Sequence, residues 1–89
     1  MKLKLAPQVA WQVIDGEAVI IDLASGVTIG LNPSGTFIWT KLLEQDDAAA
    51  AEAVVTEYGI AREEAAADVA ELIATLRERN LVVAAAAGS

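Results

Sequence analysis

The first third of the chain alternates short apolar runs with turn residues, a pattern typical of β-strands. The runs cover residues 9–14, 17–23 and 27–31 and are rich in Val and Ile. Asp15-Gly16 separates the first two runs and suits a tight hairpin, because both residue types accept a positive φ. Ala24-Ser25-Gly26 separates the second and third runs, with Gly where a left-handed residue is usually needed. Two short turns in succession predict an antiparallel meander of three strands.

The rest of the chain repeats apolar residues at intervals of three and four, which predicts three helices. Asn32-Pro33 begins the first, because Asn caps free N–H groups and Pro at the first helical position needs no N–H. Asp46 or Asp47 caps the second helix, and Gly59 ends it. The third helix runs from about residue 61 to residue 80. Its predicted core stripe consists of Val69, Leu72, Ile73 and Leu76.

Three strands followed by three helices predict an α+β fold, with the helices packed on one face of a small antiparallel sheet. The same order is that of a winged helix-turn-helix. A chain of 89 residues suits a single domain, and we expect its core over about residues 7–83. Residues 81–83 either add a short final strand or close the core, and residues 84–89 are expected to fray.

The amino-acid composition of the chain limits the classes of partner that it can bind. The net charge of −7 disfavours nucleic acid, whose binding needs cations that displace counterions, and it disfavours anionic membranes. No apolar stretch approaches the roughly 20 residues of a membrane span, and the N-terminus lacks the apolar run of a signal peptide. We therefore expect a cytoplasmic protein that binds neither nucleic acid nor membrane.

Candidate catalytic chemistry is sparse. The chain has no His and no Cys, which removes the usual general base, the thiolate nucleophile and the commonest zinc ligands. Asp46-Asp47 lacks the spaced oxygen ligands of a calcium loop, and the six Gly are too scattered to cradle phosphate. Carboxylates at Glu63-Glu64 and Asp68 fit a solvated helix start. We expect a non-catalytic protein without cofactor or metal.

The third strand offers a binding surface. A three-stranded sheet has two open edges, which proteins normally blunt with charge or proline. Residues 27–31 contain neither, and Gly30 would let another backbone approach closely. An incoming peptide strand could pair there, although the chain's own helices could equally cover this strand. The predicted docking strand consists of Val27, Thr28, Ile29, Gly30 and Leu31.

A sparse set of motifs spans residues 7–83. The most specific is Leu-Asn-x-x-Gly-x-x-Ile-Trp over residues 31–39, followed by a distant Asp68-Val69 and Leu81-Val82. The other positions are Pro7, Asp15-Gly16, Leu42-Leu43, Tyr58-Gly59-Ile60 and Leu76. Together these residues resemble the PqqD family.

The resemblance implies a RiPP recognition element, a winged-helix-like domain in the biosynthesis of ribosomally made, post-translationally modified peptides or of PQQ-type cofactors. Such domains bind the leader segment of a precursor peptide as an added strand in a groove against the third helix. They present the precursor to a modifying enzyme, such as a radical SAM enzyme or a leader peptidase. Carried over by position, the groove side of the third helix includes Ala66, Val69, Ala70, Ile73 and Arg77.

We expect the motif residues to have structural roles rather than direct contacts with the leader. Asn32 caps a helix, Gly35 permits close packing, and Ile38, Trp39 and Leu42 fill the core. Three alternative roles are open for Asp68: it could cap a helix, pair with Arg62, or contact the leader. Two other functions remain open, a DNA-binding winged helix and a protein–protein module that could dimerise through the open strand. The many carboxylates of the third helix speak against DNA.

Overall fold

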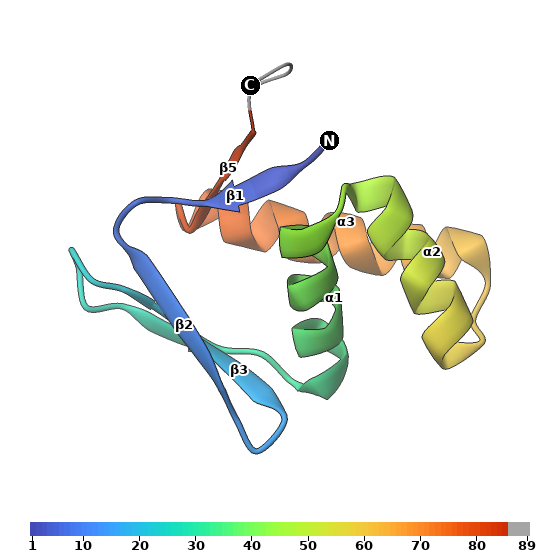
Figure 1. Cartoon of the computed structure of the whole chain (residues 1–89), viewed down its shortest axis with the longest axis horizontal. Helices are drawn as coiled ribbons and strands as arrows, with labels where there is room; N and C mark the ends of the chain where they lie inside the picture. The colour runs from blue at the N-terminus through green and yellow to red at the C-terminus, as the bar shows by residue number, and fades with distance from the viewer. Residues whose placement is uncertain (86–89) are drawn as a thin grey trace.

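The computed structural model describes residues 1–85, which form two small sheets and three helices (Figure 1). Strands β2, β3 and β4 make an antiparallel sheet in that order, and β1 pairs with β5 in a separate antiparallel sheet. The predicted α+β fold of three strands followed by three helices is confirmed. The elements are β1 (Leu3–Leu5), β2 (Val9–Ile14), β3 (Glu17–Asp22), β4 (Thr28–Gly30), α1 (Pro33–Glu44), α2 (Asp47–Tyr58), α3 (Arg62–Glu78) and β5 (Val82–Ala84).

Both predicted turns of the meander are present. Asp15 and Gly16 have φ values of 52° and 79°, which match a tight hairpin with two left-handed residues. Gly26 ends the second turn with a φ of 79°. These local conformations set the register, in which Trp11 lies opposite Ile20.

Single residues determine where helices α1 and α2 begin and where α2 ends. The Oδ1 atom of Asn32 accepts a hydrogen bond of 2.7 Å from the N–H of Gly35, as predicted for the cap of α1. The carboxylate of Asp46 accepts one of 2.8 Å from the N–H of Ala49, so Asp46 rather than Asp47 caps α2. Gly59 ends α2 with a φ of 64°.

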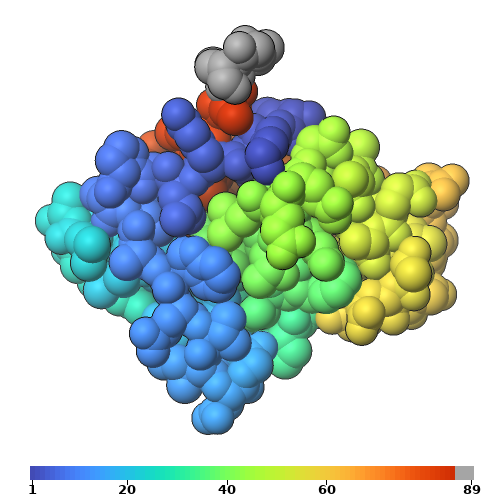
Figure 2. Space-filling model, viewed as in Figure 1, coloured from blue at the N-terminus to red at the C-terminus, as the bar shows by residue number. Residues whose placement is uncertain are grey.

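The core lies between the helices and one face of the three-stranded sheet. Trp39 of α1 is fully buried, and its ring meets that of Trp11 edge to face at 5.7 Å between centroids. Ala18 and Ile20 supply the sheet side of this core. In the space-filling view, α1 (green) separates the strands (blue to cyan) from the end of α2 and the start of α3 (yellow to orange) (Figure 2).

The small sheet of β1 and β5 closes the core from the chain ends. Leu3 pairs with Ala84 and is only 2% exposed, so the core reaches back before residue 7. The final strand was one of the two predicted outcomes for residues 81–83, whereas β1 was not predicted. Ala84, expected in a tail, lies in β5, and residues 86–89 of that tail lie outside the described residues. None of the helices in residues 1–85 is long and apolar enough to cross a membrane.

Candidate functional site

Strand β4 is an edge of its sheet, because it pairs with β3 on one side only. The regular strand covers Thr28–Gly30, shorter than the predicted residues 27–31. Backbone bonds nevertheless continue at both ends: the carbonyl of Val27 accepts a bond from the N–H of Asp22, and the N–H of Leu31 donates to the carbonyl of Ala18. The predicted segment is therefore held against β3 over its whole length.

The alternation of backbone groups leaves two residues of β4 facing outward. In an antiparallel pair, every second residue turns its N–H and C=O toward the partner strand. Val27 and Leu31 bond to β3, so the residues of the opposite parity, Thr28 and Gly30, direct their backbone groups to the open edge. No turn or loop bond within residues 1–85 uses the backbone groups of these two residues. A Cβ built on Gly30 would meet nothing within 4 Å, so the sheet face to which a side chain would point there is open.

The loop that precedes β4 is fixed by side-chain oxygens. The carboxylate of Asp22 accepts hydrogen bonds from the N–H groups of Ala24 at 2.9 Å and Ser25 at 3.2 Å. Desolvation acts to raise the pKa of Asp22, but these backbone bonds and the side chains of Gln8 and Ser25 together outweigh it and hold the pKa below its ordinary value. The hydroxyl of Ser25 in turn accepts a bond from the N–H of Val27 at 3.2 Å. These bonds fix the turn that leads into β4.

The buried hydroxyl of Thr36 locks the other end of β4, a feature that the sequence analysis missed. Its Oγ1 accepts a bond of 2.7 Å from the N–H of Ala18 and lies 3.4 Å from the carbonyl oxygen of Leu31. The one sequence signal for this pair of contacts is a threonine four residues after a helix cap. Gly35 sits beside it, where a Cβ would lie 3.1 Å from Oδ1 of Asn32.

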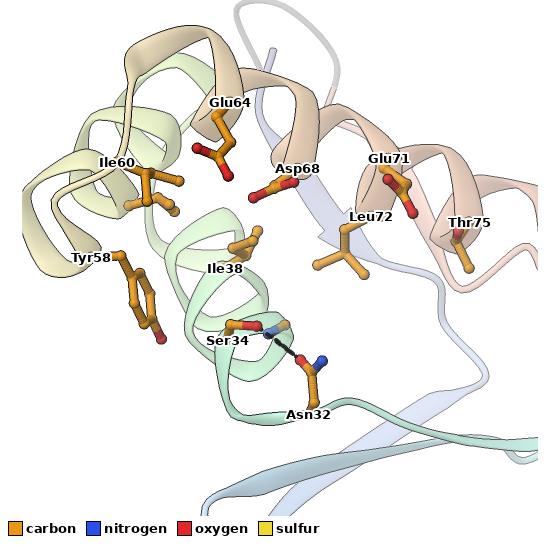
Figure 3. A pocket seen from close by; sticks show the side chains of 12 residues that line it. Asn32, Ser34, Ile38, Tyr58, Ile60, Glu64, Asp68, Glu71, Leu72 and Thr75 are labelled. Atoms are coloured by element: carbon orange, nitrogen blue, oxygen red, sulfur yellow. Dashed lines mark hydrogen bonds between the residues drawn. The ribbon is translucent and has the colours of Figure 1, made fainter.

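A hollow of about 440 Å³ opens directly after β4, between the start of α1, the end of α2 and one flank of α3 (Figure 3). Its apolar surface comes from all three helices and from the turn after α2, and carboxylates come from α3. The hollow is lined by Asn32, Ser34, Gly35, Ile38, Val54, Tyr58, Ile60, Glu64, Asp68, Glu71, Leu72 and Thr75.

The helical repeat explains why α3 contributes this particular set. Residues three, four and seven apart share one side of a helix, so Glu64, Asp68, Glu71 and Thr75 form one row. Leu72 lies between this row and the buried face of α3 and is half-buried. Figure 3 shows Leu72 pointing from α3 toward the chain segment that enters Asn32. We call residues 64, 68, 71, 72 and 75 the groove flank of α3.

The α3 residues predicted to contact a ligand do not line this hollow. Val69 and Ile73 are 2% and 7% exposed and belong to the core. Ala66, Ala70 and Arg77 are exposed, but they line neither this hollow nor the second one described below. We call these three residues the outer flank of α3. Their contact with a ligand stays a prediction, and the structure brings the groove flank to the hollow in their place.

A second hollow of about 440 Å³ lies at the other side of the sheet edge. It is formed by the hairpin between β2 and β3 together with the end of β4, and it shares Asn32 with the first. It is lined by Ile14, Asp15, Glu17, Ala18, Val19, Gly30, Leu31 and Asn32. Gly30 therefore lies on the edge strand of the sheet and also lines this hollow.

The charge of the site is negative. Three carboxylates line the first hollow, and none of the chain's six Lys and Arg residues does. Such a surface repels phosphates, which argues against a nucleic acid at this helix. Within residues 1–85, no group of three or more acidic side chains is placed to hold a metal ion.

Comparisons with known proteins agree with this geometry. The family of Coenzyme PQQ synthesis protein D (PqqD) matches residues 17–82. A solved structure described as lasso peptide synthetase B1 complexed with the leader peptide is 27% identical, covering 94% of this chain and 100% of that one, with a TM-score of 0.87. A second, TbiB1 in complex with the TbiA(beta) leader peptide, is 28% identical, covering 97% and 99%, with a TM-score of 0.85. No curated protein matches the chain. The family match spans most of the sequence, and the chain belongs to the PqqD family.

Proposed function

We propose that this protein binds the leader segment of a ribosomally made precursor peptide and presents the precursor to a modifying enzyme. The observation that carries the proposal is the pair of outward-facing residues, Thr28 and Gly30, beside a hollow walled by α3. Both similar structures named above contain a leader peptide, which supports the same role here.

The mechanism follows from the free edge. An added strand can exchange N–H···O=C bonds with Thr28 and Gly30, at most four in all, each worth about 1 kcal/mol net. These bonds are independent of the peptide's side chains and cannot select a sequence. Successive side chains of the added strand point to opposite faces, so every second one faces the side of the sheet on which the helices pack. The hollow is therefore the part of the site that selects the peptide.

The role of the protein is that of an adaptor without chemistry of its own. Holding the leader keeps the rest of the precursor at a high effective concentration near whichever enzyme the adaptor contacts. Family resemblance favours a radical SAM enzyme or a leader peptidase as that partner, acting in the cytoplasm where the precursor is synthesised.

The test is a titration of the ¹⁵N-labelled protein with the leader of the precursor encoded beside its gene. We expect the amide signals of Thr28, Gly30 and Leu72 to shift most, and calorimetry to give one site. Thr28→Pro removes one outward N–H without breaking a bond to β3 and should weaken binding about tenfold. Thr28→Val keeps that N–H and is the matched control. Absence of binding, or equal binding by both variants, would refute strand addition at β4.

A further inference from the structure

A row of unneutralised carboxylates borders the hollow. Glu64, Asp68 and Glu71 follow each other at intervals of four and three along α3 and are exposed. Like charges at these intervals repel and destabilise a helix slightly. None of the ion pairs found in residues 1–85 includes them, and the nearby Arg62 pairs with Glu52 instead, at 2.6 Å. A cation brought in by a ligand would remove this repulsion.

The floor of the hollow is apolar. Ile38 and Val54 are buried at its base, and Leu72 and Ile60 are half-buried around them. Tyr58 is 44% exposed on the α2 side, and its ring is held by Phe37, edge to face at 5.5 Å. An apolar floor beneath an acidic rim matches a side chain with an aliphatic stem and a cationic head.

No basic residue of the chain lines the hollow, so the carboxylates of its rim have no Lys or Arg partner there. Lys4 lies in β1 and Lys2 just before it, and Arg77 and the C-cap residue Arg79 lie at the far end of α3 from Glu64. Lys41 lies over the ring of Phe37, 5.3 Å from its centroid. An acidic or phosphorylated peptide would be repelled from this hollow, while a basic one finds no competing cation among the residues that line it.

We propose that the leader places a Lys or Arg in this hollow, with an apolar residue two positions away on the same face of the added strand. The aliphatic stem and the apolar neighbour cover Leu72 and Ile38, and the cationic head pairs with Asp68 and Glu71. Two positions is the spacing at which strand side chains share a face. This inference rests on the proposed function and names the side-chain chemistry that the hollow selects.

The test compares two double variants with equal changes in charge. Asp68→Asn with Glu71→Gln removes two rim carboxylates, whereas Glu63→Gln with Glu78→Gln removes two exposed carboxylates of α3 that do not line the hollow. We expect the rim variant to weaken binding of the same leader roughly three- to tenfold in 50 mM salt, as for two partly exposed ion pairs. The control should keep its affinity within twofold, and the difference should shrink in 300 mM salt.

A charge exchange makes the test specific. Replacing each Lys and Arg of the leader's docking segment with Glu should weaken binding to the native protein, and Asp68→Lys with Glu71→Lys should restore it. If the leader shifts Thr28 and Gly30 but its affinity ignores salt and both rim substitutions, the inference fails and the proposed function stands. A docking segment without Lys or Arg would also overturn the inference. If no leader shifts β4 at all, the proposed function itself fails.

Discussion

Two sides of α3 meet different surroundings. On the buried face, Ala65, Val69, Ile73 and Leu76 are each at most 7% exposed and contact the rest of the core. On the groove flank, Asp68 and its acidic neighbours are exposed and border a hollow that no side chain of residues 1–85 fills. The same helix thus supplies a filled surface and an unfilled one. Stability should depend mainly on the first and, under the proposed function, leader binding on the second, so substitutions should separate the two properties.

The largest effect should come from the buried face. Leu76 is fully buried, and Leu76→Ala leaves a cavity that costs roughly 2–5 kcal/mol of unfolding free energy. That is a large share of the stability of a domain of this size. Urea unfolding followed by circular dichroism measures the change, with the exposed Glu78→Ala on the same helix as control. A loss below about 1 kcal/mol would contradict the packing of α3 described above.

A substitution on the groove flank should lower leader affinity clearly while lowering stability only slightly. Leu72 is half-buried and lines the hollow, so Leu72→Ala should cost about 1 kcal/mol of stability, half of a full leucine burial. Binding of the leader should weaken about five- to tenfold, because the peptide loses its apolar contact. Leu72→Met keeps the volume and should retain affinity within about twofold. Calorimetry on the folded variants decides; an unchanged affinity for Leu72→Ala would remove the hollow from the binding site.

The contrast also explains which features were predictable. The hairpin at Asp15-Gly16 and the caps at Asn32 and Gly59 depend on residues next to one another, so local chemistry specifies them. Strand β1 escaped prediction because three residues show no period and their partners lie about 80 positions away. The pairing that closes such a sheet is a property of the whole fold.

The site was predictable only in part, for a related reason. Absence of charge and proline in residues 27–31 marked the free edge, since that is a local property. Helical periodicity identified the buried face of α3 but does not state which neighbouring element each flank meets. Assignment of Val69 and Ile73 to the groove placed core residues there, while Leu72, at the border of the same stripe, is the one that reaches the hollow.

The smallest effect should come from the outer flank. Ala70 is exposed and lines neither hollow, and Gln is a good helix former, so Ala70→Gln should change stability by less than about 0.5 kcal/mol. Its leader affinity should stay within about twofold of the native value in the same calorimetric assay. The neighbouring Leu72→Ala is the internal comparison, because the two residues sit two positions apart on different flanks. If Ala70→Gln weakened binding and Leu72→Ala did not, the peptide would dock along Ala66, Ala70 and Arg77. The acidic hollow would then have no part in recognition.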